Sequence, residues 1–471
     1  MATSGSFTGN RGTSNSTSPR LILNWNRIET DIAGNRSKIR LTLKLDVNGR
    51  VNFSANKTGV LHGNSFTYTS GVSGSNLTRT LHTRDVWVNH NSDGTKSQTF
   101  SATFNIGITF SGVKINSLSV SGTANIDAIP RASGLTAFSL SSTSIAYNTA
   151  RTIKYTLDRK SSSFSHSISL RLGNKTIKTW TDSGTGARTQ SLTASNANDI
   201  LKALPNSTSG TLTLRVQTKS GKTNIGSAAT RTVNISVASS VSPSASGIST
   251  SISGNGRDKT INKYVQSITK VTSSFTRSAG YGASISSSSI VIRRVSGGAN
   301  SQTISGNSGT TANPVSLNGT YEAIGTVKDS RGRTATSRTT FTVESYSAPR
   351  ITKFTASRNG TNPATVNITR AGTWSSIGTG SASLNNLTIL IQKRVRTSST
   401  WSNVQSTTGN TGTFSGNVNA TGNSEAQTYQ FRITITDSFN NKASSTVDIG
   451  TSFQELTISR GKGIGVGKVH E

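Results

Sequence analysis

The feature that most constrains the fold is a hairpin pattern that returns at a fixed interval along the 471-residue chain. Each copy is an alternating strand, a short turn that begins Lys-Ser or Asp-Ser, and a Thr-rich strand that ends in Val or Ile. The turn serines, Ser220, Ser330 and Ser438, stand 110 and 108 residues apart. A unit that recurs at this period indicates tandem domains of about 100 residues, the size of an immunoglobulin-like sandwich.

Proline-marked joints divide the chain at a similar spacing. Pro130, Pro243 and Pro349 stand 113 and 106 residues apart, and proline at a joint stiffens the link and cannot donate to a strand ladder. We therefore predict an all-β chain of tandem β-sandwich domains, an N-terminal β-sandwich followed by about three immunoglobulin-like domains. The predicted boundaries are 1–18 (polar N-terminal arm), 19–130 (N-terminal β-sandwich), 131–242, 243–348 and 349–450 (three immunoglobulin-like domains) and 451–471 (Gly-rich C-terminal strap).

Side-chain alternation supports strands rather than helices. Residues 39–45 and 429–435 alternate apolar and polar side chains, which predicts one core face and one wet face. Segment 195–204 is the only helix we expect, because it begins with capping residues and stops at Pro205. Residues 1–18 are so polar that we expect them to become ordered only on a partner.

The net charge of +32 arises because acids are scarce: 50 Lys and Arg face 18 Asp and Glu. The cations are scattered and aromatic residues make up only 6% of the chain, whereas nucleic-acid binders cluster their cations among stacking aromatics. We therefore expect no nucleic-acid partner. Diffuse attraction to a polyanionic surface, such as a phosphate-bearing bacterial cell-wall polysaccharide or teichoic acid, fits the charge better.

The chain has no cysteine, no apolar signal segment at its N-terminus and no apolar run near the length of about 18 residues that spans a membrane. We therefore expect no disulfides, no membrane partner and no export by the usual signal. These features together predict a protein that is made in a reducing cytoplasm and released by other means.

The segment VWVNHNSDGT (86–95) raises the question of reactive chemistry, because His90 lies beside Asn91 and Asp93. The five histidines show no zinc-ligand spacing, and Asp93-Gly94 is explained by a turn that needs a positive φ. We predict a strand turn here. Calcium or another metal, and a ligand contact, stay open as alternatives.

The Gly-rich segment 460–468 looks like a phosphate-binding loop but lacks the required Gly and Ser/Thr positions. We predict instead an extended strap that docks on a neighbour. The chain also lacks a Gly-x-Ser-x-Gly elbow and a His-Glu-x-x-His motif, and its few acids give a glycosidase carboxylate pair little support. We expect no enzyme activity, no catalytic residue, no cofactor and no metal.

Exposed tryptophans could stack on sugar rings, although in a small sandwich a single Trp usually belongs to the core. Trp87 is the best exception, since it points away from the face that Val86 and Val88 share. Trp87 and His90 are therefore the candidate glycan-contact residues. The other tryptophans are Trp25, Trp180, Trp374 and Trp401.

Several motifs resemble one family. Residues 88–97 leading to Ile129-Pro130-Arg131-Ala132-Ser133 resemble the N-terminal domain of minor structural proteins from the tails of siphophages that infect Gram-positive bacteria. Segments 191–198, 346–349, 354–358 and 463–469 occur in the same order in that family, so the resemblance spans about the whole chain. Family members often continue past the Gly-rich strap, and this chain ends at Glu471, which puts a separate receptor-binding tip in doubt.

The resemblance implies a phage virion structural protein of the tail tip, baseplate or tail fibre, assembled in the host cytoplasm and contributing to host cell-surface attachment. It implies multiple copies and offers no catalytic residue to transfer. The expected partners are other virion proteins, copies of itself in a homo-oligomer such as a trimer, and the host wall polymer. The alternatives are a capsid head fibre or decoration protein, and a wall-glycan depolymerase.

Overall fold

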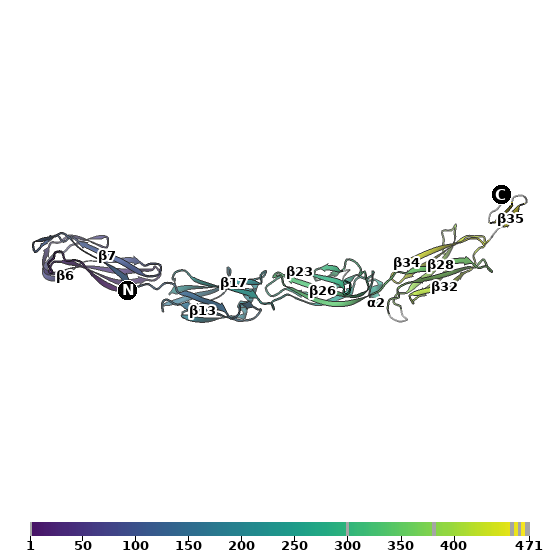
Figure 1. Cartoon of the computed structure of the whole chain (residues 1–471), viewed down its shortest axis with the longest axis horizontal. Helices are drawn as coiled ribbons and strands as arrows, with labels where there is room; N and C mark the ends of the chain where they lie inside the picture. The colour runs from purple at the N-terminus through teal and green to yellow at the C-terminus, as the bar shows by residue number, and fades with distance from the viewer. Residues whose placement is uncertain (1, 298–300, 379–382, 453–455, 460–462, 467–471) are drawn as a thin grey trace. The chain divides into compact units, whose positions relative to one another are not determined.

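The computed structural model describes residues 2–297, 301–378, 383–452, 456–459 and 463–466. Strands gather in four successive groups along the chain (Figure 1), and the chain divides into two compact units, Met1–Ser240 and Val241–Glu471. Each of the four groups consists mainly of two antiparallel sheets. The predicted fold class, tandem β-sandwich domains with immunoglobulin-like character, is confirmed.

The N-terminal sandwich packs two four-stranded sheets on one core. The first sheet has the order β1 (Ser4–Thr8), β2 (Arg20–Asp31), β3 (Arg36–Phe53) and β6 (Val72–Asn89). The second has the order β10 (Leu118–Ile126), β7 (Lys96–Phe104), β4 (Lys57–Leu61) and β5 (Asn64–Tyr68), and β8 (Ile108–Phe110) pairs with β9 (Val113–Ile115). The alternating row Ile39, Leu41, Leu43 and Leu45 is fully buried between the sheets, as its period predicted.

The second group contains the predicted helix. Its smaller sheet is β11 (Gly134–Leu140), β13 (Arg151–Asp158) and β16 (Gly186–Leu192). Its larger sheet is β12 (Ser144–Ile145), β19 (Ala229–Val237), β17 (Ser209–Ser220), β14 (Phe164–Leu172) and β15 (Lys175–Asp182), with β18 (Thr223–Asn224) beside β17. Helix α1 (Ala194–Lys202) starts at a capping box between Thr193 and Asn196, and ends just before Pro205.

The third and fourth groups repeat this plan. The third has the sheets β20 (Ser244–Ile252), β22 (Val271–Ser278), β25 (Ser308–Thr310) and β21 (Tyr264–Val265), β27 (Thr334–Glu344), β26 (Gly319–Asp329), β23 (Ile285–Arg294), β24 (Gln302–Ser305). The fourth has the sheets β28 (Arg350–Arg358), β29 (Val366–Thr373), β32 (Thr413–Ala420) and β31 (Ser402–Gly409), β30 (Leu387–Val395), β33 (Tyr429–Asp437), β34 (Lys442–Ile449). The recurring hairpins of the sequence are β17/β19, β26/β27 and β33/β34.

The structure contains one short helix and one short strand pair that the sequence did not predict. Helix α2 (Arg257–Ile261) was not predicted, because it is short and its N-cap, Gly256, offers no capping side chain. The predicted strap contains β35 (Leu456–Ser459) paired with β36 (Gly463–Val466). Residues 453–455, 460–462 and 467–471 of the predicted strap lie outside the described residues.

Residues 2–18 differ from the expected partner-dependent arm. Strand β1 pairs along β2, and the Phe7 ring packs against the core of the same sandwich. A Cβ atom added at Gly122 would lie 2.0 Å from the Phe7 ring, so the ring fits only because that position has no side chain. Backbone pairing and one well-placed ring hold this segment despite its polar composition.

Candidate functional site

His90 makes two hydrogen bonds inside the protein. Its Nδ1 lies 2.8 Å from the Gly94 carbonyl oxygen, and its Nε2 lies 2.9 Å from the Ser37 hydroxyl. A carbonyl oxygen only accepts, so Nδ1 carries the proton and Nε2 accepts from the Ser37 hydroxyl. Burial lowers the pKa of His90, and Arg27 and Lys96 act in the same direction against the Gly94 hydrogen bond. The ring is therefore held in one neutral tautomer.

The Ser37–His90 contact has the spacing of a nucleophile and its base, but its burial prevents that chemistry. Ser37 is fully buried and His90 is 8% exposed. A nucleophile must be reached by its substrate, which this hydroxyl cannot be. Ser37 was missed by sequence reasoning, although it stands one step before the apolar row 39–45 and so occupies an inward position.

The turn at His90 also holds the segment that leaves the N-terminal sandwich. Gly94 has φ +86°, as the predicted turn requires, and its carbonyl oxygen accepts the Ile129 N–H at 2.9 Å. A Cβ atom at Gly94 would lie 2.0 Å from the Ile129 carbonyl oxygen. The segments 88–97 and 129–133, which stand apart in the sequence, thus meet in one structural unit.

The recurring hairpins serve the same purpose in the later groups. The Ser133 N–H donates to the Thr218 hydroxyl at the end of β17, at 2.9 Å. The Val241 carbonyl oxygen accepts from Arg333 Nη1, just before β27, at 2.8 Å. In both cases the end of the hairpin binds the backbone of the segment that leads into its own sandwich.

The most extensive of these contacts surrounds Tyr346, in the segment between β27 and β28. The Tyr346 hydroxyl donates to Asp437 Oδ2 at 2.7 Å and accepts from Asn441 Nδ2 at 2.7 Å. The same Asp437 oxygen accepts from Asn385 Nδ2 at 3.3 Å. Burial and the Asp437 hydrogen bond raise the pKa of Tyr346, so the phenol stays protonated as a donor.

Trp87 lies where the alternation predicted, on the outer face of the first sheet. Its side chain is 40% exposed. The Arg36 guanidinium carbon is 4.5 Å from the ring centroid, and the Lys38 Nζ is 5.7 Å from it. Trp87 therefore offers a partly open aromatic surface, whereas both ring nitrogens of its predicted partner, His90, are already bonded within the protein.

The other tryptophans divide between core and surface. Trp25 and Trp374 are buried in the cores of their sandwiches, as expected for a single Trp. The Trp180 Nε1 donates to the Tyr155 hydroxyl at 3.1 Å. Trp401 is half-buried, and Arg394 and Arg432 both contact its ring. The cation run 393–396 was a sequence signal for Arg394, and none pointed to Arg432.

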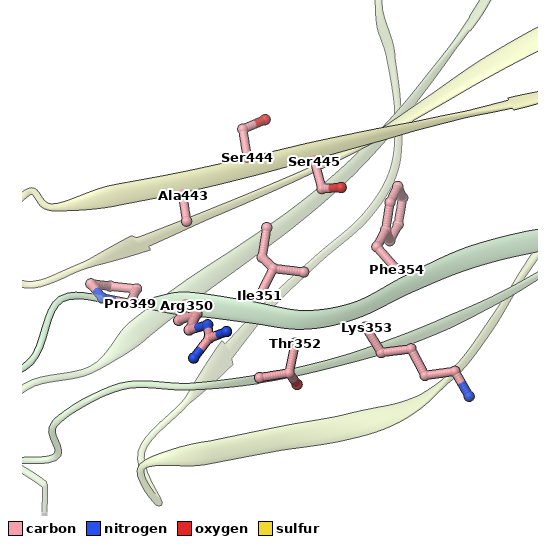
Figure 2. A pocket seen from close by; sticks show the side chains of 9 residues that line it. All are labelled: Pro349, Arg350, Ile351, Thr352, Lys353, Phe354, Ala443, Ser444 and Ser445. Atoms are coloured by element: carbon pink, nitrogen blue, oxygen red, sulfur yellow. The ribbon is translucent and has the colours of Figure 1, made fainter.

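A groove of about 390 Å³ lies between β28 and β34, the edge strands of the two sheets of the fourth group. Figure 2 shows Ile351 and Phe354 on the side of β28 toward β34, with Thr352 and Lys353 on the opposite side. None of the 9 residues that line the groove is acidic. It therefore does not present the pair of carboxylates that glycoside hydrolysis needs.

Among the described residues, no group of three or more His, Cys, Asp and Glu side chains could hold a metal ion. The described helices are also too short and too polar to span a membrane. A family model described as "Siphovirus protein of unknown function (DUF859)" matches residues 11–471. The chain belongs to this siphovirus family.

Several solved structures align with the siphovirus protein at low identity. One is a tetra-tandem repeat from the extending region of a large adhesion protein, with 12% identity, 90% of this chain and 97% of that chain covered, and a TM-score of 0.32. The ICAM-5 D1–D4 ectodomain fragment aligns with 12% identity, 92% and 99% coverage, and a TM-score of 0.32. A solved chain from a 1.5-MDa bacterial ice-binding adhesin aligns with 16% identity, 68% of this chain and 99% of that chain covered, and a TM-score of 0.28. No curated protein matches the siphovirus protein.

Proposed function

We propose that this siphovirus protein is a structural protein of the virion, placed in the tail tip, baseplate or tail fibre, that contributes to attachment to a Gram-positive host. The observation that carries the proposal is the family match over residues 11–471, which takes in all four groups of strands.

The proposed mechanism is binding without catalysis. Its partners are other virion proteins and further copies of the chain, in a homo-oligomer such as a trimer. Copies that engage a repetitive wall polymer together gain avidity, so each single contact can be weak. The burial of the Ser37–His90 pair and the acid-free groove between β28 and β34 support a non-enzymatic role.

Charge points to an anionic wall polymer as the surface partner. Only 18 acids accompany 50 Lys and Arg, so the chain carries a formal charge of +32. Such a surface attracts a polymer that bears repeated negative charges, even without one dense patch. Host teichoic acid or another anionic cell-wall polysaccharide has this chemistry.

Antibody labelling of intact virions tests the proposed location. We expect the label on the tail. A label on the capsid would overturn the tail assignment in favour of a head fibre or decoration protein, and unlabelled particles would overturn the virion role altogether. A cryo-EM map of the particle would then identify the neighbouring virion proteins.

A salt titration of binding to purified Gram-positive cell wall tests the attachment mechanism. Binding should weaken steadily with added salt, because surface charges are screened beyond a Debye length of about 8 Å at physiological ionic strength. Binding that is absent, or independent of salt, would contradict the mechanism. Release of reducing ends from the wall glycan would identify a depolymerase instead.

A further inference from the structure

The outer face of the sheet β31-β30-β33-β34 carries a tryptophan whose ring is in contact with two arginines. The guanidinium carbon of Arg394, on β30, lies 4.6 Å from the Trp401 ring centroid. The guanidinium carbon of Arg432, on β33, lies 4.2 Å from the same ring. Cation–π contacts of this kind hold both arginines in fixed positions on the surface. We call Trp401, Arg394, Arg432, Gln392 and Gln430 the Trp401 platform.

Neutral amides, rather than acids, accept the hydrogen bonds of the platform arginines. Arg394 Nε and Nη2 donate to Gln430 Oε1 at 3.0 and 2.7 Å. Arg432 Nη2 donates to Gln392 Oε1 at 2.6 Å. Within the described residues, neither arginine forms an ion pair with a carboxylate. The amides orient the guanidinium groups but leave two positive charges uncompensated.

The acid that the strand register places beside Gln430 is already paired. Asp448, on β34, stands opposite Gln430 in the register and forms its ion pair with Arg396. Its charge is therefore offset by a third arginine at the edge of the platform. The platform remains a site of net positive charge beside an aromatic ring.

The Trp87 ring also has two cations beside it, but the charge balance there is different. Arg36 pairs with Asp31 at 3.0 Å, and Lys38 lies 3.8 Å from Glu29. Both cations around Trp87 thus have an acid beside them. Charge complementarity to an anion is therefore expected at Trp401 and not at Trp87.

We propose that the Trp401 platform binds a phosphodiester-linked polymer of polyol or sugar units, an inference that rests on the proposed attachment function and assigns part of it to one sheet face. A guanidinium matches the geometry of phosphate oxygens and forms charge-assisted hydrogen bonds with them. The Trp401 ring offers an apolar surface for the carbon chain between phosphates. The glutamine amides can bond to the hydroxyl groups of the same units.

The test measures binding of poly(glycerol phosphate) to the full chain and to two double variants. Arg394→Gln with Arg432→Gln removes two charges at the platform, and Arg36→Gln with Lys38→Gln removes two charges at Trp87. We expect the platform variant to lose about tenfold or more in affinity and the control to lose less than about threefold. Equal losses would overturn the platform and leave only diffuse charge.

A measurement on the unchanged protein covers the case in which the platform variant folds poorly. The Trp401 indole signal, assigned in an NMR spectrum with the variant Trp401→Phe, should shift on addition of poly(glycerol phosphate), while the buried Trp25 and Trp374 signals stay in place. A Trp401 signal that does not move while the chain binds would overturn the platform alone. If the unchanged protein does not bind the polymer or the wall, the attachment function itself fails.

Discussion

The Gly94 carbonyl oxygen accepts two hydrogen bonds, one from the His90 ring and one from the Ile129 N–H. At the scale of single residues, this oxygen explains why a His, a Gly and a distant Ile-Pro segment belong together. His90 fixes the turn, the turn presents the carbonyl, and the carbonyl holds the exit segment. The residue that suggested chemistry in the sequence stabilises a joint.

The variant His90→Ala tests this role. It removes the hydrogen bond to Gly94 and leaves the buried Ser37 hydroxyl without its acceptor, so we expect a loss of about 1–3 kcal/mol in the stability of the N-terminal sandwich. Native-state hydrogen exchange of peptides from β3 and β6 measures the effect. The control Trp87→Phe keeps an aromatic ring on the outer face and should change exchange little; equal effects of the two variants would argue against the role of His90.

At the scale of elements, the hairpin turns form hydrogen bonds with the segments that enter or leave a sandwich. The turn between β6 and β7 holds Ile129, and the β33/β34 turn holds Tyr346. The first turn has no room for a Cβ atom at Gly94, and the second binds the Tyr346 hydroxyl through two hydrogen bonds. Substitutions there should therefore cost more than the same substitutions in open turns.

Gly94→Ala tests how closely the turn between β6 and β7 packs against Ile129. The added Cβ would meet both an unfavourable φ of +86° and the Ile129 carbonyl oxygen at 2.0 Å. Gly112→Ala is the matched control, because Gly112 has φ +80° in the same sandwich with nothing within 4 Å. We expect the control to cost about 1 kcal/mol from backbone strain, and Gly94→Ala to cost clearly more. Equal shifts of the calorimetric unfolding midpoint would contradict the close fit.

Tyr346→Phe tests the contact between Tyr346 and the β33/β34 turn. It removes the hydrogen bond to the buried Asp437 carboxylate, and we expect a loss of about 1–3 kcal/mol. Tyr321→Phe is the control, because the buried Tyr321 hydroxyl has no hydrogen-bond partner among the described residues, and its removal should be neutral or stabilising. Calorimetry of both variants decides the point: Tyr346→Phe should lower an unfolding midpoint that Tyr321→Phe leaves in place or raises.

At the scale of the whole molecule, titration should distinguish the two compact units. The four described histidines, His62, His82, His90 and His166, all lie in residues 1–240. Burial is the first cause that lowers the pKa of each of them. Residues 241–471 contain one histidine, His470, which lies outside the described residues.

We expect residues 1–240 to lose stability when the pH falls from about 7.5 to about 5.5, because unfolded histidine titrates near pH 6.5. The folded histidines have lower pKa values, so the unfolded chain binds more protons below that pH. The free energy of unfolding that these lowered pKa values contribute is complete above pH 6.5. It declines as the pH falls towards the pKa values of the folded histidines. Calorimetry at the two pH values, with limited proteolysis to assign the transitions, should show the shift mainly in residues 1–240; an equal shift in 241–471 would contradict it.

Much of the fold could be predicted because it depends on local periodicity. The buried row 39–45 and the hairpin β33/β34 follow from alternating side chains. Trp87 is exposed because its side chain points to the opposite face of the strand from that of Val88. The order of residues 2–18 could not be predicted, because β1 is held by backbone pairing and by the gap that Gly122 leaves for Phe7. Composition carries no information about either contact.

The sequence by itself determined the repeat, the all-β class, the excess of positive charge and the side of the strand on which each residue lies. These properties depend on neighbours two residues apart or on counts along the chain. Only the tertiary structure decided that Ser37 meets His90, that Tyr346 meets Asp437, and that the Trp401 ring contacts two arginines that form no ion pair within the described part of the chain. Those contacts join residues far apart in sequence, and their distances are set by how strands pair and sheets pack.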